Sequence, residues 1–275
     1  MLAGALCIAV LALAGCGGAT DAPGDRGDRG DRGDRGDRES TAPSSLTEEL
    51  SGTLTVFAAA SLTEVFTEFE TKLEAQHPSL EVVLVFGGSS ALAQQLIAGA
   101  PADVFAAADE TTMQMAVDGA VVQAPVAFAR NLLALAVPRD NPGDVASLDD
   151  LARPDLVIAL CASEVPCGRA ADLLLLGQGV EPSVDTREQD VRSVLTKIKL
   201  GEVDAGLIYA TDARVASDRV ATVPIAGAEA VATTAFVAVV SATSQAEAAA
   251  AFVALITSTE GVRVLSAAGF TGVSG

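Results

Sequence analysis

The stretch Val56-Phe57-Ala58-Ala59-Ala60-Ser61-Leu62 opens the folded part of the chain, and later segments repeat its pattern. Its apolar residues are typical of a buried strand, and apolar residues then recur at helical spacing, at Leu62, Val65, Phe66, Phe69 and Leu73. Ser61 and Glu64 have the spacing of a capping box, which predicts Ser61 as the N-cap of this helix. A hydroxyl and unbonded N–H groups at a helix N-terminus attract anions. A serine that only caps the helix is the simpler interpretation, so a binding site requires matching donors from other segments.

Strands and helices are predicted to alternate from residue 54 onward, which indicates an α/β fold with mainly parallel sheets. The predicted strands cover 54–58, 81–86, 103–107, 132–137, 156–160, 205–209, 219–224 and 236–240. The predicted helices cover 62–76, 90–98, 110–118, 147–153, 168–176, 191–200, 245–257 and 260–267. Asp109 and Asp190 are placed to cap the helices that follow them, and Ser147 and Asp150 have capping-box spacing.

Two apolar runs, at 132–137 and 235–240, lie on either side of the middle segment of the chain. We expect the chain to cross there between a split first domain and an inserted second domain. Domain I would comprise 51–133 and 235–275, and domain II would comprise 134–234. A chain of 275 residues, of which 50% are hydrophobic, is long enough to give each domain its own core.

Residues 1–15 are predicted to be a lipoprotein signal peptide. The apolar segment before Gly15 is too short to cross a bilayer as a helix. Leu13-Ala14-Gly15-Cys16 resembles the bacterial lipobox, in which the cysteine is lipidated. Residues 16–50 would then form a lipidated flexible tether, in which Gly-Asp-Arg repeats five times over 24–38. The repeat also contains the cell-adhesion tripeptide Arg-Gly-Asp, so an adhesion lipoprotein is an alternative.

Cys161 and Cys167 lie six residues apart in a chain that we expect to be exported. An oxidising compartment favours a disulfide between them. A metal site built on the same pair is less well supported, because His77, the only histidine, is far away in the sequence.

The formal net charge of −19 argues against nucleic-acid binding and against electrostatic attachment to anionic lipid. An anionic ligand would have to be held by local dipoles. Four further segments offer suitable groups, at Ser89 after paired glycines, Cys167 and Val191 at predicted helix starts, and Tyr209 at a strand end. Each of these residues also has a purely structural explanation. Ser89 would belong to a glycine-rich turn, Cys167 to a disulfide and Val191 to a helix start, and Tyr209 would be a half-buried aromatic.

Several motifs together resemble the molybdate-binding proteins of ABC importers. They are Thr55-Val-Phe-Ala-Ala-Ala-Ser61-Leu, Gly88-Ser-Ser-Ala-Leu-Ala-Gln-Gln-Leu-Ile-Ala-Gly-Ala-Pro-Ala-Asp-Val-Phe105, Asp190-Val-Arg192 and Gly206-Leu-Ile-Tyr-Ala-Thr-Asp-Ala213. The resemblance covers roughly residues 52–275. It implies the two-domain periplasmic-binding-protein fold of the second type, with an oxyanion held in the cleft between the domains.

The resemblance also implies the roles of five residues. Ser61 and Ser89 would donate hydroxyl and backbone N–H hydrogen bonds from domain I. Cys167 and Val191 would donate backbone N–H groups from domain II, and Tyr209 would donate its hydroxyl. The family often has alanine in place of Cys167, a difference that a backbone donor tolerates. None of the five is a carboxylate, so fully ionised molybdate, tungstate or sulfate is favoured over hydrogen phosphate. Arg169 and Arg192 are expected to be exposed helix residues or members of ion pairs.

The implied function is capture of molybdate, and of tungstate, by a monomeric, lipid-anchored receptor on the extracytoplasmic face of the cell membrane. The receptor would need no cofactor, would catalyse nothing, and would deliver the anion to an ABC permease and its ATPase. A receptor for another oxyanion such as sulfate is an alternative. A serine hydrolase is not supported, because no Gly-x-Ser-x-Gly motif occurs and His77 lies at the far end of the helix that begins at Ser61.

Overall fold

The structure is a computed structural model that describes residues 49–273. The predicted signal peptide, Cys16 and almost all of the predicted tether lie outside the described residues. The described residues all belong to one compact unit. Strands and helices alternate along the part that is described, as the sequence predicts, and they build two five-stranded sheets.

The first sheet contains the stretch from which the fold was predicted. Its strands, in spatial order, are β2 (Ser79–Gly87), β1 (Ser51–Ala59), β3 (Val104–Ala107), β10 (Thr233–Val240) and β4 (Val122–Asn131). Strand β1 pairs in parallel with β2 and β3, whereas β10 is antiparallel to β3 and β4. We call this sheet and the helices packed on it the first lobe.

The second sheet is formed by the middle of the chain. Its strands, in spatial order, are β7 (Thr186–Glu188), β6 (Ile158–Cys161), β8 (Ala205–Tyr209), β5 (Leu133–Pro138) and β9 (Val220–Val223). Strand β6 is parallel to β7 and β8, and β5 is antiparallel to β8 and β9. In each sheet four of the five strands therefore run in the same direction, as the prediction of mainly parallel sheets requires, and only β10 and β5 run against them. We call this sheet and its helices the second lobe.

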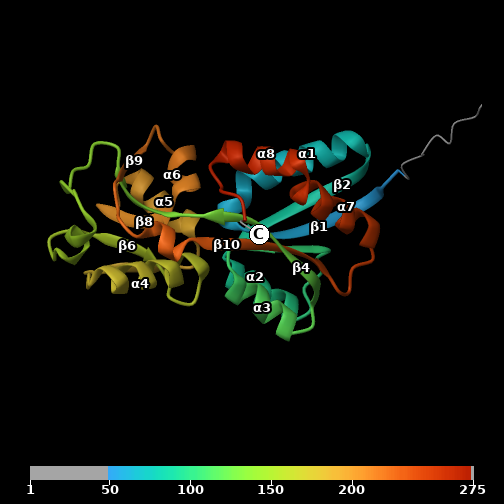
Figure 1. The fold of residues 1–275 in the computed structure, drawn as a ribbon, viewed down its shortest axis with the longest axis horizontal. Helices are drawn as coiled ribbons and strands as arrows, with labels where there is room; N and C mark the ends of the chain where they lie inside the picture. Colours follow the sequence, from blue (N-terminus) through green and yellow to red (C-terminus); the bar gives the residue numbers. More distant parts are fainter. Residues whose placement is uncertain (1–48, 274–275) are drawn as a thin grey trace, which may run out of the picture. The chain divides into compact units, whose positions relative to one another are not determined.

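Helices cover both faces of each sheet (Figure 1). On the first sheet they are α1 (Thr63–Gln76), α7 (Ala246–Thr257) and α8 (Thr259–Ala268) on one face, and α2 (Ser89–Ile97) and α3 (Glu110–Asp118) on the other. On the second sheet they are α4 (Pro166–Gln178) on one face, and α5 (Val191–Leu200) and α6 (Ala210–Val215) on the other. Short 3-10 helices are η1 (Ala60–Leu62), η2 (Leu148–Ala152) and η3 (Ala228–Val231).

The core beneath α1 is built from the helical apolar pattern that follows the opening strand. Phe66, Phe69 and Phe252 are completely buried. The ring centre of Phe66 lies 6.0 Å from that of Phe69 and 5.7 Å from that of Phe252, both edge to face. Truncating such a buried aromatic to alanine costs about 3–5 kcal/mol, so this cluster fixes α1, and with it the loop at Ser61, on the sheet.

The chain changes sheet where β4 ends at Asn131 and β5 begins at Leu133, and returns between the end of β9 at Val223 and the start of β10 at Thr233. The predicted run 132–137 therefore belongs to the second sheet, and the run 235–240 belongs to the first.

Two strands and one α-helix were not predicted, namely β4, β7 and α6, and neither were the short 3-10 helices η1 and η3. Strand β4 contains Pro125, has an irregular register with β10, and exposes several of its residues, so no apolar run marks it. Strand β7 has three residues, none of them buried, and α6 has only six residues. Elements this short are held by their neighbours in the fold, and local patterns do not reveal them.

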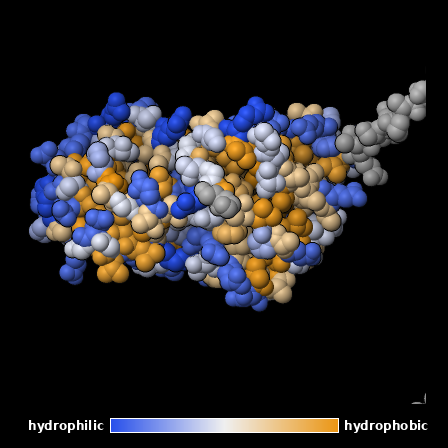
Figure 2. All heavy atoms as spheres, in the orientation of Figure 1, coloured by the Kyte–Doolittle hydropathy of each residue, from blue (hydrophilic) through white to orange (hydrophobic). Residues whose placement is uncertain are grey.

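On the face of the molecule drawn in Figure 2, hydrophilic and hydrophobic residues are interspersed over both lobes. Within residues 49–273 no single helix is long and apolar enough to cross a membrane, although α7 and α8 pass by length and composition when taken together as a pair bent by 60°. The same residues contain no group of three or more His, Cys, Asp or Glu side chains arranged to hold a metal ion.

Candidate functional site

One small pocket is lined by all five residues that the resemblance assigns to ligand binding. The first lobe contributes Ala59, Ala60, Ser61, Gly87, Gly88, Ser89 and Ala108. The second lobe contributes Val165, Pro166, Cys167, Gln189, Asp190, Val191 and Tyr209. The cavity volume of this pocket, about 20 Å³, is far below the roughly 300–1,000 Å³ of pockets for drug-sized ligands, so it suits a small ion.

Ser61 lies in the pocket, but it does not cap the helix as predicted. A 3-10 turn, η1, precedes α1, and the N-cap of α1 is Leu62, with no side-chain capping bond. The predicted capping box is absent because the Glu64 carboxylate pairs with Arg192 of the second lobe. Ser61 is buried, and it has no hydrogen bond to the start of the helix, which removes the simpler explanation for this serine.

Ser89 is the first residue of α2, one position earlier than predicted, and it is almost fully buried. Its Oγ accepts a hydrogen bond from the Ala108 N–H at 3.1 Å. Because the hydroxyl accepts in this bond, its own hydrogen is free to be donated to a ligand.

Cys167 and Val191 lie in the first turns of α4 and α5. Within residues 49–273 no protein acceptor occupies either backbone N–H, as expected for the first turn of a helix. The positive ends of the two helix dipoles therefore face the pocket. Asp190 caps α5 as predicted, since its carboxylate oxygens accept from the Ser193 N–H at 2.9 Å and the Ser193 Oγ at 3.0 Å.

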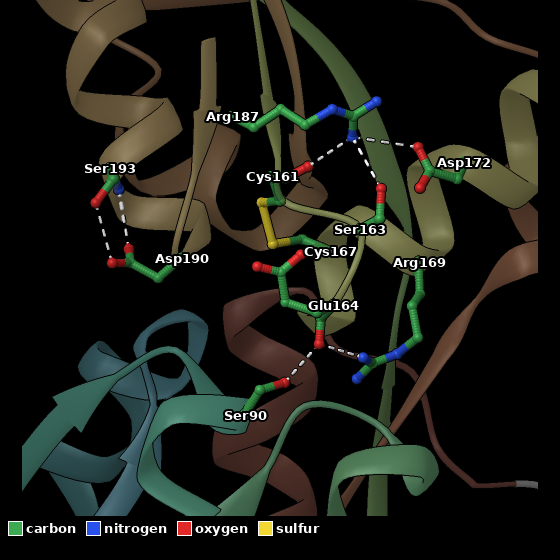
Figure 3. Close-up of a disulfide and its surroundings, with 10 residues drawn as sticks. All are labelled: Ser90, Cys161, Ser163, Glu164, Cys167, Arg169, Asp172, Arg187, Asp190 and Ser193. Carbon is green, nitrogen blue, oxygen red and sulfur yellow. Dashed lines mark hydrogen bonds and ion pairs between the residues drawn. A yellow bond between two sulfur atoms is a disulfide. The ribbon is translucent and has the colours of Figure 1, made fainter. Parts of the chain in front are cut away.

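The loop before Cys167 is closed by a disulfide to Cys161 at the end of β6 (Figure 3). The two Cα atoms are 5.7 Å apart. At Gly168 a Cβ would lie 1.9 Å from the Ala162 carbonyl oxygen, so only glycine fits there. The disulfide and this close backbone contact together fix the turn that presents the Cys167 N–H.

Tyr209 ends β8, and only 1% of its surface is exposed. Its hydroxyl is buried, and no group among the described residues makes a hydrogen bond of acceptable geometry with it, although the Thr233 side chain lies near enough to oppose the rise of its pKa. Burial raises the pKa of this hydroxyl, so it stays a proton donor. A buried donor without a partner costs about 1–3 kcal/mol. A ligand acceptor in the pocket would remove that cost.

No lysine or arginine lines the pocket. The two arginines next to it form ion pairs, as expected from the sequence: Arg169 with Asp109 at 2.7 Å and Arg192 with Asp212 at 2.8 Å. Asp212 is completely buried, and although it lies in the quoted motif that ends at Ala213, no role was predicted for it. Burial raises the pKa of Asp212 to about 7, against the opposing effect of Arg192.

Two further pocket residues act through their backbones, namely Gly88, whose glycine pair was noted in the sequence, and Ala108, which was not predicted. Gly88 lies against Gln189 of the second lobe, where a Cβ would stand 2.2 Å from the Gln189 carbonyl oxygen. Ala108 positions Ser89 through its N–H. The position of Gly88 in a Gly-Gly pair was the only available signal, because paired glycines permit close backbone approach.

The chain is similar to known proteins over most of its length. The model of the family described as bacterial extracellular solute-binding protein matches residues 54–271. The molybdate-binding protein ModA of Mycobacterium tuberculosis is 38% identical over 218 residues, which cover 79% of this chain and 84% of that protein.

Solved structures of lower identity share the fold. The periplasmic molybdate-binding protein of Azotobacter vinelandii is 19% identical, with a TM-score of 0.71, over 80% of this chain and 100% of that one. The sulfate-binding protein SubI of Mycobacterium tuberculosis is 19% identical, with a TM-score of 0.69, over 81% and 87%. These two structures establish the periplasmic-binding-protein type II fold and nothing further. The family match and the 38% identical relative together identify the family. The chain belongs to the bacterial extracellular solute-binding proteins, in the family of the molybdate-binding proteins of ABC importers.

Proposed function

We propose that this chain captures molybdate between its two lobes and delivers it to an ABC permease and its ATPase. The observation that carries the proposal is the buried Tyr209 hydroxyl without a protein partner, which lines a pocket shared with helix N-termini. A tetrahedral dianion needs several converging donors, and Ser61, Ser89, Cys167 and Val191 supply them without a counter-charge. The chain itself catalyses nothing and needs no cofactor.

The donor set favours an anion that carries no proton. Hydrogen phosphate must itself donate a hydrogen bond, for which a carboxylate is the usual acceptor. Asp190 is the carboxylate residue in the pocket lining, and both of its oxygens accept hydrogen bonds from Ser193. Molybdate and tungstate are both fully ionised dianions at neutral pH, so their charge suits such a pocket equally well.

Sulfate is the second candidate, because a sulfate-binding protein shares this fold. Sulfate has the same charge and is smaller, so the pocket would have to exclude it by size. The 38% identical relative is named a molybdate-binding protein, which favours molybdate.

The test is isothermal titration of the chain without residues 1–15, with Cys16→Ser so that no lipid can be attached. We expect one-to-one binding of molybdate and of tungstate, and no heat from phosphate. Binding of sulfate alone would keep the fold and change the ligand. Absence of binding to all of these oxyanions would refute the proposal.

We further propose that Cys16 is lipidated and anchors the protein at the extracytoplasmic face of the membrane. Replacement by serine should release the protein from the membrane fraction, and retention of the variant there would contradict the anchor. We also propose that the receptor is a monomer, which sedimentation measures directly.

We propose, finally, that the domains divide as 51–133 with 235–275, and 134–234. The change of sheet between Asn131 and Leu133 supports this division. Replacing 134–234 by a short linker should leave a first domain that unfolds cooperatively, and a non-cooperative product would contradict it.

A further inference from the structure

Two arginines stand next to pocket residues in the sequence, yet each extends to the opposite lobe and not into the pocket. Arg192 directly follows Val191 in α5, and its guanidinium pairs with Glu64 of α1 in the first lobe. Its Nε lies 2.8 Å from Asp212 Oδ1 of α6 in its own lobe. The guanidinium is thus shared between a carboxylate of each lobe.

This shared arginine connects three segments of the pocket. Glu64 lies three residues after Ser61, and Asp212 lies three residues after Tyr209. Asp212 is fully buried, and Arg192 is the cation that faces it among the described residues. Because Asp212 holds one edge of the guanidinium, the remaining nitrogens are directed toward Glu64.

Arg169 forms a second contact between the lobes. It lies two residues after Cys167, and its Nη2 is 2.7 Å from Asp109 Oδ2 and 2.7 Å from Thr112 Oγ1. Asp109 follows Ala108, whose N–H holds Ser89. The Ser90 Oγ adds a hydrogen bond of 2.7 Å to the Glu164 carbonyl oxygen across the same boundary (Figure 3).

We propose that Arg192 and Arg169 are positioning residues that hold the lobes closed over the bound anion without contacting it. We name Arg192 with Glu64 and Asp212, and Arg169 with Asp109 and Thr112, the arginine clamps. The inference rests on the proposed function, since it concerns release of the anion from that pocket. The clamps span the lobes, so they form only when the lobes have closed. They therefore slow the departure of the anion and leave its arrival unchanged.

The test compares two variants that each remove one carboxylate charge. Glu64→Gln breaks the Arg192 pair between the lobes. Glu260→Gln is the matched control, because Glu260 pairs with Lys72 at 2.8 Å inside the first lobe. Both glutamates are partly exposed, at 39% and 43% of the side chain, so neither variant leaves a buried cavity.

The chain contains one tyrosine, Tyr209, and no tryptophan, so tyrosine fluorescence reports on the pocket itself. Stopped-flow mixing with molybdate gives both the association and the dissociation rate constants. We expect Glu64→Gln to raise the dissociation rate about fivefold, the upper end for a partly exposed ion pair. The association rate should stay within about twofold, because long-range charge effects on it are small in 0.15 M salt, and Glu260→Gln should change neither rate.

Equal dissociation rates in the two variants would overturn the inference, as would a slower association with unchanged dissociation. The proposed function is tested separately, by whether the wild-type protein binds molybdate at all. If wild type binds none of the oxyanions, small-angle scattering decides the inference instead. A larger radius of gyration for Glu64→Gln than for wild type would then support it, and equal radii would refute it.

Discussion

Replacing Gly88 by alanine should abolish tight binding without unfolding the protein. Gly88 is the N-cap of α2, with φ −62° and ψ 126°, a conformation that alanine adopts readily. The three atoms nearest to a Cβ at this position belong to Gln189 and Asp190 of the second lobe. The first lobe can therefore fold unchanged, and the conflict arises only when the lobes close.

The size of the effect follows from one distance. A Cβ at Gly88 would lie 2.2 Å from the Gln189 carbonyl oxygen, whereas ordinary contact begins at 3.4 Å. The lobes must then stay about 1 Å further apart, which stretches a hydrogen bond of about 2.9 Å beyond the useful limit near 3.2 Å. Losing two hydrogen bonds to a charged ligand costs about 3–6 kcal/mol, so the dissociation constant should rise at least about 100-fold.

The assay is isothermal titration with molybdate, together with thermal unfolding of the ligand-free protein. Gly177→Ala is the matched control, because a Cβ at Gly177 in α4 has no atom within 4 Å. The control should bind like wild type and unfold at the wild-type temperature or above, because alanine favours a helix interior. Gly88→Ala should unfold at a slightly lower temperature, because alanine is a weaker N-cap than glycine, but it should still fold. A Gly88→Ala variant that binds molybdate within about threefold of wild type would refute the reasoning, because such a result requires the lobes to close despite the clash.

Three further predictions concern single groups. Ser89→Ala should weaken oxyanion binding by about 1–3 kcal/mol in titration calorimetry, the cost of an unmet hydrogen bond to a charged group, and unchanged affinity would remove Ser89 from the site. The Cys161–Cys167 disulfide should appear as a two-dalton mass increase on reduction, and free thiols in protein purified from an oxidising compartment would contradict it. Burial raises the pKa of Asp212 from 3.8 to about 7, so the native protein keeps a proton that the unfolded chain releases between these values. The free energy of unfolding should therefore fall by about 4 kcal/mol from this group as the pH rises through that window, and Asp212→Asn should lose that fall in urea titrations.

Local signals in the sequence predicted local structure well. Asp109 and Asp190 cap their helices, and Ser147 forms the predicted capping box with Asp150, because each of these bonds spans only three residues. The alternation of strands and helices was visible for the same reason, since it depends on the spacing of neighbouring apolar residues.

The features that could not be predicted from the sequence depend on contacts between residues that are far apart in the chain. Ser61 and Glu64 have the spacing of a capping box, but Glu64 pairs instead with Arg192, 128 residues away. Nothing in the local sequence around Asp212 signals that its carboxylate is buried. The five pocket residues were assigned through the resemblance to a family, and the structure brings all five to one pocket. Their roles in binding stay predictions until the titrations are done.

The arginine clamps have a consequence for how binding depends on salt. With both nearby guanidinium groups occupied by carboxylates, no positive side chain lines the pocket, in a protein whose formal charge is −19. A dianion therefore approaches against a repulsive field, which dissolved ions screen over a Debye length of about 8 Å at 0.15 M ionic strength. Added salt should speed its capture, whereas salt slows the association of ligands that are attracted by an oppositely charged surface. This receptor should therefore capture its anion faster in saline surroundings than in dilute ones.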